Sequence, residues 1–479
     1  MGDPMDTTTV AVEHTVALTP HALFALFGAG PAAGWLFGAH CDDVRVGAPV
    51  SLRLPVDPDG RHEVEVLGRL ARVVPGVLLD IEHSQPWRGR LSLRLAPVGA
   101  GRTRVRLRAD VPTEGLEWLL HRRGIPLPEP PDDGSLRLGA ITNASGPGAV
   151  YSLSAELMAE LAVAEVNADG GIAGRPGRLV VADDGTDARQ AATEAVRMAR
   201  LGCRAVFVNS TSASFEAVRR ALAGRDVLVV HSVLNEGGGT SPTAVRFGER
   251  PRAQLEALVG PTMATTGGRR WFLVGEDYVW SHGVHAAARR VVDRAGGEVV
   301  GESLTPLGTG DFTAVLERIR TSGADLVLSS LIGADEVAFE RQSADAGLRD
   351  TVRTVALVLD ESTLAHIGPA AGQGLRTALA YFEDGPIAGN DGLQQRYRAA
   401  YGTWAPAITA LSETVYESIH RYARVRHLDP SGSAGDHGRA LMRRRAGAVD
   451  VVGARDLVAP RLYVAEATAG RLRVVGEAF

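Results

Sequence analysis

The chain has 479 residues, which is too long for one ordinary hydrophobic core and predicts two or three folding units. Hydrophobic residues make up 45% of it and charged residues 22%, as is usual for a globular protein. The formal net charge of −5 excludes a general basic field for nucleic acid. The absence of lysine excludes a phosphate-binding P-loop lysine and a lysine Schiff base.

The two cysteines, Cys41 and Cys203, are too few for a disulfide framework or a cysteine zinc site. The first residues carry no basic segment followed by an apolar run, which an export signal would show. No run of about 18 apolar residues is present to span a membrane. We therefore expect a cytoplasmic protein without a membrane span.

Short strand-like runs fill the first part of the chain. Residues 7–18 alternate in the manner of a strand, Pro20 opens a short helical stretch, and residues 113–124 (TEGLEWLLHRRG) have apolar residues at helical spacing. Turn residues such as Pro58–Gly60 and Gly99–Gly101 separate the runs in between. This order predicts an α+β fold in which a sheet wraps around a helix. The runs are PVSLRLPV, HEVEVLGRLARVVP, VLLDIEHS, GRLSLRLAPV and TRVRLRADV.

Scattered features of this part carry a resemblance to a known superfamily. They are Trp35–Gly38, Gly47, the Gly60 turn, Val74–Gly76, Trp87 and the helix around Trp118. In this order they resemble the START-like, or SRPBCC, superfamily, whose helix-grip fold would occupy residues 1–125. The resemblance implies a hydrophobic cavity between the sheet and a helix. Relatives use this cavity to bind apolar ligands, to contact partner proteins or, occasionally, to catalyse.

A proline-rich, acidic stretch at residues 126–135 is typical of a spacer between domains. From residue 136 to 479 apolar strands alternate with amphipathic helices, which indicates an α/β architecture of parallel sheets covered on both faces. Two such blocks predict two doubly wound lobes. We expect one lobe to span about 136–252 and 386–446, and the other about 253–385 and 447–479. Ligands of such sheets bind beyond the carboxyl ends of the strands.

Four segments resemble the type I periplasmic-binding-protein fold, and more narrowly its urea and short-chain-amide branch among the branched-chain amino acid receptors. The Asp277–Tyr278 turn and the stretch Pro306–Phe312 are the most specific parts. The resemblance runs over nearly all of 136–479. It implies two lobes that close by hinge motion around a small polar molecule and do no chemistry on it. The segments are SGPGAVYSLSAELMAELAVAEVNADGGIAGRP (145–176), FVNSTSASFEAVRRAL (207–222), FLVGEDYVWSHG (272–283) and GEVVGESLTPLGTGDFTAVLERIRTSGADLVLSSLIG (297–333).

The resemblance implies a pocket between the lobes, with Ser210, Thr211 and Ser212 on one side of it. These residues follow a strand and precede a helix, where free backbone N–H groups and a hydroxyl can bind a carbonyl or carboxylate oxygen. The alternative is that Thr211 or Ser212 only caps the helix. Tyr278 and Trp280 resemble the aromatic pair that closes on the ligand in relatives, although inter-lobe packing is the alternative for Trp280.

The other predicted wall residues lie at two further strand ends. His231, Ser232 and Val233 follow one strand of the first lobe, and Tyr381 with the adjacent Phe382 ends a later strand. Relatives usually carry an aromatic residue at the position of Ser210, a tyrosine at that of His231 and a threonine hydroxyl near that of Val233. The loss of these groups is expected to enlarge the pocket and change its hydrogen bonds. We therefore expect an amide-, urea- or amino-acid-like ligand and leave its identity open.

No sequence pattern points to catalysis. Asp183 and Asp184 could hold a metal, but adjacent acids at a strand end are more often caps or solvated loop residues. Glu82 and His83 are strand neighbours and face opposite sides, so they cannot act as a dyad. Asp360 could pair with a ligand ammonium, although capping of the following helix is favoured. We predict no catalytic residue, metal or cofactor.

Three functions remain open on these grounds. The leading one is a cytoplasmic ligand sensor, because no export signal is visible and a second domain is fused to the binding module. A protein partner would then respond to lobe closure. The second is the solute-binding component of an ABC uptake system. The third is an enzyme or carrier that uses the N-terminal cavity for an apolar ligand. None of the three binds nucleic acid.

Overall fold

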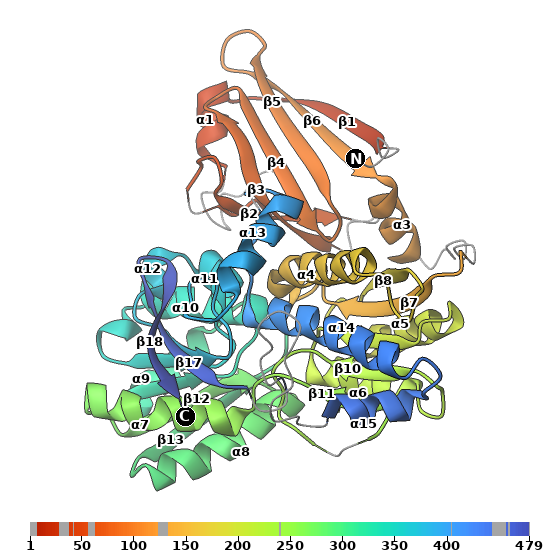
Figure 1. The fold of residues 1–479 in the computed structure, drawn as a ribbon. Helices are drawn as coiled ribbons and strands as arrows, with labels where there is room; N and C mark the ends of the chain where they lie inside the picture. Colours follow the sequence, from red (N-terminus) through yellow and green to blue (C-terminus); the bar gives the residue numbers. More distant parts are fainter. Residues whose placement is uncertain are drawn as a thin grey trace. The chain divides into compact units, whose positions relative to one another are not determined.

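The computed structural model describes residues 7–27, 38–41, 43–55, 63–122, 133–238, 241–403, 405–442, 457 and 460–478 (Figure 1). The chain divides into two compact units. The N-terminal unit takes Met1–Pro130 and Ala144–Ala149, and the C-terminal unit takes Pro131–Asn143 and Val150–Phe479.

The described part of the N-terminal unit contains a six-stranded sheet. Its strands are β1 (Thr7–Val16), β2 (Pro49–Pro55), β3 (Glu63–Val74), β4 (Leu78–Gln85), β5 (Gly89–Pro97) and β6 (Thr103–Pro112). Their order is β1-β6-β5-β4-β3-β2, and every neighbouring pair runs antiparallel. Since successive side chains of a strand point to opposite faces, one face is apolar and forms the core, and the other face is polar.

Two helices among the described residues flank this sheet. Helix α1 (Pro20–Ala25) begins after Thr19, whose hydroxyl accepts a hydrogen bond from the backbone N–H of Ala22, and it buries Leu23 in the core. Helix α3 (Thr113–Arg122) continues from β6. Trp118 of α3 lies 5.2 Å from Trp87, measured between ring centroids. The sequence predicted these strands and the closing helix, and the structure confirms them.

The first lobe of the C-terminal unit has a parallel five-stranded sheet. Its strands are β7 (Leu136–Thr142), β8 (Gly177–Asp183), β9 (Ala205–Val208), β10 (Leu228–His231) and β11 (Ala244–Arg246), in the order β11-β10-β9-β7-β8. Helices of both faces bury the apolar side chains of these strands, which explains their near-continuous apolar sequence. The helices are α4 (Ala149–Ala168), α5 (Ala188–Arg200), α6 (Ser212–Ala221), α14 (Ala410–Leu428) and α15 (Ala434–Met442).

The second lobe has a seven-stranded sheet in the order β13-β12-β14-β15-β16-β17-β18. The first five strands are parallel, and the C-terminal hairpin β17–β18 joins the sheet antiparallel (Figure 1). The strands are β12 (Arg270–Glu276), β13 (Glu298–Thr305), β14 (Leu326–Ser329), β15 (Arg353–Ala356), β16 (Arg376–Leu379), β17 (Leu462–Thr468) and β18 (Arg471–Ala478). The helices are α7 (Pro251–Thr266), α8 (Val279–Arg294), α9 (Thr313–Ser322), α10 (Gly333–Asp345), α11 (Glu361–Ile367) and α12 (Pro369–Gly372), with a 3₁₀ turn at Leu348–Asp350.

Helix α13 (Asn390–Tyr401) follows the second lobe in sequence and contacts the first, where Arg396 pairs with Glu165 of α4 at 2.7 Å. The alternation of strands and helices predicted for residues 136–379 is confirmed, as is the C-terminal hairpin. The short strand β11 and the long helix α14 were not predicted. Among the predicted features, Trp35–Phe37, the Pro58–Gly60 turn and most of the spacer lie outside the described residues, as does the chain crossing expected near residue 446.

Among the described residues, no helix combines the length and apolar character that crossing a membrane requires.

We expect Gly115→Ala to destabilise the N-terminal unit. In most helix interiors this change stabilises by about 0.5–1 kcal/mol. A Cβ atom on Gly115 would lie 2.4 Å from the Trp87 ring, however, so α3 must shift, at a cost of about 1–3 kcal/mol. The free energy of unfolding, measured with denaturant, tests this. Gly392→Ala in α13 meets only the flexible Arg396 side chain and is the control. Equal gains for both variants would contradict the packing of α3 on Trp87.

Candidate functional site

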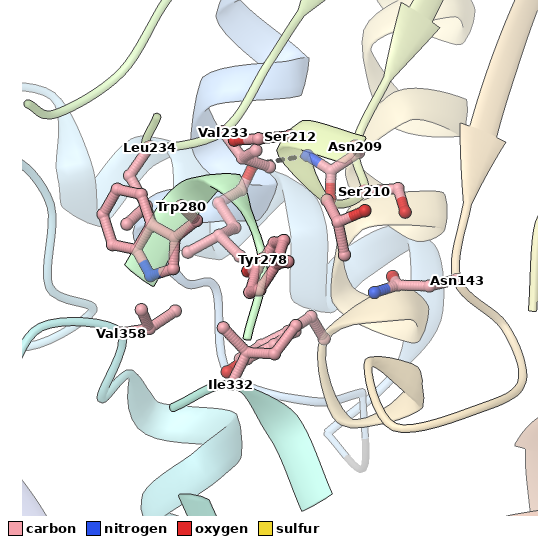
Figure 2. Close-up of a pocket in the computed structure, with 13 residues that line it drawn as sticks. Asn143, Asn209, Ser210, Ser212, Val233, Leu234, Tyr278, Trp280, Ile332 and Val358 are labelled. Carbon is pink, nitrogen blue, oxygen red and sulfur yellow. Dashed lines mark hydrogen bonds between the residues drawn. The ribbon is translucent and has the colours of Figure 1, made fainter. Parts of the chain in front are cut away.

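A pocket lies between the two lobes of the C-terminal unit, with about 420 Å³ of empty space, part of it open to solvent (Figure 2). Both lobes contribute to its wall, and the described lining contains no charged side chain. From the first lobe come Asn143, Tyr151, Asn209, Ser210, Thr211, Ser212, Val233, Leu234 and Leu411, and from the second come Tyr278, Trp280, Ile332 and Val358.

The N-terminus of α6 forms one side of the pocket. Thr211 is the N-cap residue, and its hydroxyl oxygen accepts a hydrogen bond from the backbone N–H of Ser214 at 3.1 Å. The N–H groups of the first helical turn have no acceptor within the helix, and the helix dipole adds partial positive charge there. Since Thr211 and Ser212 line the pocket, this end of α6 offers backbone donors to an anionic or carbonyl oxygen.

The hydroxyl protons beside the α6 N-terminus are already engaged. Ser210 donates to Asp184 Oδ2 at 2.6 Å, and Ser212 donates to Glu236 Oε2 at 2.5 Å. The hydroxyl of Thr211 donates to Ser214 Oγ at 3.1 Å. These hydroxyls are therefore held in place, and the backbone N–H groups remain as the donors for a ligand.

Two amide oxygens add unused acceptors to the same wall. Asn209 donates from Nδ2 to the carbonyl oxygens of Ser232 and Leu411, at 3.1 and 3.0 Å, so its Oδ1 is oriented by the structure. Among the described residues, neither Asn209 Oδ1 nor Asn143 Oδ1 has a hydrogen-bond partner, and both atoms are buried. Figure 2 shows the Asn143 side chain directed toward Tyr278, with Ser210 close by. A ligand that donates hydrogen bonds here would satisfy groups that are otherwise costly to bury.

Aromatic and aliphatic side chains form the remaining wall. Trp280 is 2% exposed and its Nε1 donates to the carbonyl oxygen of Ser330 at 3.1 Å, so the indole presents only its ring to the pocket. Burial, followed by the charge of Glu276, raises the pKa of the Tyr278 hydroxyl well above its ordinary value. Tyr151 accepts a hydrogen bond from the backbone N–H of Gly333 at 2.6 Å and so connects the two lobes.

Four of the predicted wall residues do not line this pocket: His231, Ser232, Tyr381 and Phe382, all of them buried. His231 is fully buried behind it, stacked on Phe215 at 4.5 Å, with Nε2 at 3.1 Å from the carbonyl oxygen of Ser210. Burial lowers its pKa to about 3, so it is neutral. Ser232 bonds to Val208 within the sheet, and Tyr381 donates to Asn390 Oδ1 at 2.5 Å. The predicted Ser210, Thr211, Ser212, Val233, Tyr278 and Trp280 all line the pocket.

The structure adds lining residues that the sequence did not indicate. Asn143 directly follows β7, and Asn209 directly follows β9, so both stand where a parallel sheet delivers its ligand contacts. Their place directly after a predicted strand could have identified both as ligand contacts from the sequence. Ile332 and Val358 follow β14 and β15 in the same way, whereas Tyr151 and Leu411 belong to helices and carried no such signal.

Buried carboxyl groups surround the pocket without lining it. Burial raises the pKa of Asp184 to about 7 and outweighs the hydrogen bonds from Ser210 and Ser214 that lower it. Burial likewise raises the pKa of Glu276 to about 8 and that of Asp360 to about 6. Asp360 caps α11 by accepting from the backbone N–H of Thr363 at 2.8 Å, which confirms the capping role favoured from the sequence.

One buried cluster has the composition of a hydrolytic triad. Ser330 Oγ lies 3.2 Å from His285 Nε2, and His285 Nδ1 lies 2.6 Å from Glu302 Oε1. Ser330 is fully buried, however, and its hydroxyl also bonds to the carbonyl oxygen of Val274 at 3.2 Å. It cannot reach a substrate carbonyl, so the cluster is structural. The described residues contain no group of three or more histidine, cysteine or acidic side chains placed to hold a metal ion.

Comparisons with known proteins agree with this architecture. A family model described as periplasmic binding protein matches residues 135–441, which is more than half of the chain. The Leu/Ile/Val-binding protein BraC3 of Rhizobium johnstonii is 30% identical over 199 residues, which cover 40% of this chain and 53% of that protein. The chain spans about half the length of the curated relatives it matches.

Solved structures match over the same region. The substrate-binding protein LivJ of Streptococcus pneumoniae, in complex with isoleucine, superposes with a TM-score of 0.63 at 17% identity, covering 72% of this chain and 99% of that one. A solute-binding protein of R. palustris in complex with benzoate gives 0.62 at 18% identity, covering 72% and 96%. At these identities the likeness establishes the two-lobed α/β fold. The N-terminal sheet lies outside the matched family region, so its START-like identity stays a prediction.

We expect Asp184→Asn to change the pH dependence of stability. The folded pKa of about 7 lies above the ordinary value of 3.8, so the unfolded chain loses its proton first as the pH rises. The wild type therefore loses free energy of unfolding through this group between about pH 4 and 7, and the variant does not. The free energy of unfolding, measured across this range, checks the prediction. A constant difference between the two proteins would show that Asp184 is ionised throughout.

Proposed function

The chain belongs to the periplasmic-binding-protein family, and we propose that its C-terminal unit closes around an α-amino acid with an apolar side chain. The pocket between the lobes carries this proposal, because it combines the N-terminus of a helix, an apolar wall and two amide oxygens that have no partner among the described residues. Proteins of this family bind ligands and are not enzymes.

The carboxylate of the ligand is assigned to the N-terminus of α6. The described lining contains no arginine or histidine, so only backbone N–H groups and the helix dipole favour a negative charge there. Neutral donors that are already oriented lose little entropy when the ligand arrives. The engaged hydroxyls of Ser210 and Ser212 fix the loop that presents these donors.

The ammonium group is assigned to the amide oxygens of Asn143 and Asn209. An ammonium has three donors, and these two buried acceptors lack partners among the described residues. Benzoate carries no donor and would leave both oxygens unsatisfied, at a cost of about 1–3 kcal/mol each. Acetamide and urea offer donors but no apolar body to fill the wall of Val233, Trp280 and Val358. Urea and short-chain amides are therefore less favoured as ligands than an amino acid.

Closure of the lobes brings α8 against the first lobe. A Cβ atom on Gly283 of α8 would lie 2.7 Å from Cβ of Glu236, and Glu236 accepts the hydrogen bond from Ser212 beside the ligand position. The Tyr151–Gly333 hydrogen bond is a second contact across the cleft. These contacts link ligand binding to lobe closure, because Glu236 of the first lobe contacts both Ser212, beside the ligand position, and α8 of the second lobe.

The uptake role, as solute-binding component of an ABC system, is better supported by the relatives than the cytoplasmic sensor placed first from the sequence. The sensor remains a second candidate, because a separate sheet unit is fused to the binding module. Fractionation of source cells discriminates between them: protein outside the cytoplasm supports uptake, and protein retained inside supports the sensor.

We expect leucine, isoleucine or valine to raise the melting temperature more than benzoate, 4-hydroxybenzoate, acetamide or urea. A ligand at 100 times its dissociation constant adds about 2.7 kcal/mol of stability.

Asn143→Ala should weaken the binding of the best amino acid by about 1–3 kcal/mol in calorimetry, since one acceptor is lost. Tyr381→Phe removes a buried hydroxyl outside the pocket and is the matched control. Stabilisation by amides or benzoates alone would overturn the amino-acid assignment.

We expect Gly283→Gln to hold the lobes apart and weaken ligand binding by about tenfold or more, since the new side chain cannot fit against Glu236. Ala286→Gln, on an exposed position of the same helix, is the control and should leave affinity unchanged. Small-angle scattering should show a ligand-induced decrease in the radius of gyration for the wild type and the control only. Normal affinity in Gly283→Gln would show that closure does not require this contact.

A further inference from the structure

The polar face of the N-terminal sheet carries a dense group of arginines. Five of them line one shallow hollow with about 890 Å³ of empty space, part of it open to solvent: Arg72, Arg90, Arg94, Arg106 and Arg108. Two carboxylates, Asp80 and Asp110, and the hydroxyl of Ser92 complete the lining. All five arginines are exposed. Residues 1–130 hold 14 arginines and 15 acidic residues, so this concentration of positive charge belongs to one face and not to the unit as a whole.

Strand register places these side chains in adjacent rows. Arg94 of β5 stands directly opposite Arg106 of β6, and Ser92 stands opposite Arg108 in the next row. Directly opposed residues on neighbouring strands have Cβ atoms about 4.5–5.5 Å apart, and like charges in that arrangement destabilise a sheet. A neutral or acidic residue in place of either arginine would make the sheet more stable than this opposed pair of like charges does.

The carboxylates of the hollow neutralise only part of this charge. Asp80 accepts from Arg90 at 2.6 Å, and Asp110 accepts from Arg108 at 2.9 Å. Burial raises the pKa of Asp80, but hydrogen bonds from Ser92 and Arg90 and the charge of Arg90 outweigh it, so this carboxyl is ionised.

Arg94 and Arg106 lack such partners. Glu13, which stands opposite Arg106, pairs with Arg104 instead at 3.2 Å. Within the part of the chain that the structure describes, neither Arg94 nor Arg106 has a hydrogen-bonded or ion-paired acceptor. The two guanidinium groups are thus free to bind an anion from solution.

We propose that this arginine face binds a small molecule through its phosphate groups. Guanidinium groups bind phosphate oxygens in pairs of parallel hydrogen bonds, and a phosphate offers enough oxygens for Arg94 and Arg106 to share one group. Arg72 stands opposite Asp80, which itself stands opposite Ser92. It adds a further guanidinium to the hollow for a second phosphate, and Asp80 offsets part of its charge. A single carboxylate has two oxygens and fits this spread of donors less well. The described lining contains no aromatic ring on which a base could stack, so the phosphates are the recognised part.

Titration of the full-length protein with pyrophosphate by calorimetry tests the proposal. Arg94→Gln and Arg106→Gln should each weaken binding by about tenfold or more, because each removes a charge-assisted pair of hydrogen bonds. Arg102→Gln, in the β5–β6 turn and outside the hollow, removes the same charge and should change affinity less than about twofold. Without pyrophosphate, Arg106→Gln should melt no lower than the wild type, since it removes a like-charge contact.

Three outcomes would overturn the proposal. The first is no heat of binding at millimolar pyrophosphate and low salt. The second is an equal loss of affinity in Arg102→Gln, which would indicate only a general response to net charge. The third is loss of pyrophosphate binding in Gly283→Gln with normal binding in Arg94→Gln, which would place the anion in the C-terminal pocket. Amino-acid binding is measured in a separate titration, so a negative result with pyrophosphate does not bear on the function proposed for the C-terminal pocket.

Discussion

The direction of the parallel strands is the constraint on which the pocket depends. Each parallel strand ends at the same edge of its sheet, so the residues that follow different strands meet there. Asn143 follows β7, Ser210–Ser212 follow β9, and Tyr278 follows β12. The two lobes turn these edges toward each other, and the wall forms from loops that are far apart in sequence. Any change that alters a strand's register would displace the loop that follows it and the contacts it makes.

The second constraint is that the pocket excludes charge from its own wall while keeping carboxyl groups nearby. Asp184, Glu276 and Asp360 are almost fully buried and have raised pKa values because burial disfavours their ionised forms. Asp184 and Asp360 accept hydrogen bonds that fix a loop or cap a helix, so their role is positional. Below about pH 7, a protonated Asp184 would also spare the proposed ligand carboxylate a negative neighbour behind Ser210. As proposed, the site would favour an anion through the orientation of neutral donors and not through a countercharge.

Much of the fold follows from local sequence, but the orientation of single side chains does not. The apolar runs of β7 and β10 and the turn residues around them suffice to predict strands and their edge of the sheet. Whether a residue at that edge faces the ligand depends on the next layer. His231 ends β10, yet its ring turns onto Phe215 and away from the pocket, whereas Val233, two residues on, lines it. Tyr381 is held by Asn390 of α13, a helix whose position no local pattern indicates.

Two pocket residues, Thr211 and Asn209, show how a structural role and a ligand-binding role can coincide. Thr211 caps α6, so the capping role weighed against ligand binding in the sequence is present, and it leaves the first-turn N–H groups facing the cavity. The two roles are compatible, because a cap satisfies only one of the several donors that a helix start leaves free. Asn209 was missed because an asparagine after a strand is common in loops. Its importance depends on two carbonyl contacts, to Ser232 and Leu411, that only the tertiary structure supplies.

The two proposed anion sites of this chain would attract an anion in different ways, one with neutral backbone donors and the other with exposed charged side chains. The C-terminal pocket would hold a carboxylate with backbone N–H groups among lining residues that are mostly buried, where mobile ions screen poorly. The arginine face of the N-terminal sheet is open to solvent, and its attraction rests on the charges of Arg94 and Arg106. Salt at physiological strength screens exposed charges beyond about 8 Å but leaves short contacts between buried groups almost unchanged. Raising the ionic strength should therefore weaken phosphate binding steeply and amino-acid binding little, so one variable separates the two sites without a substitution.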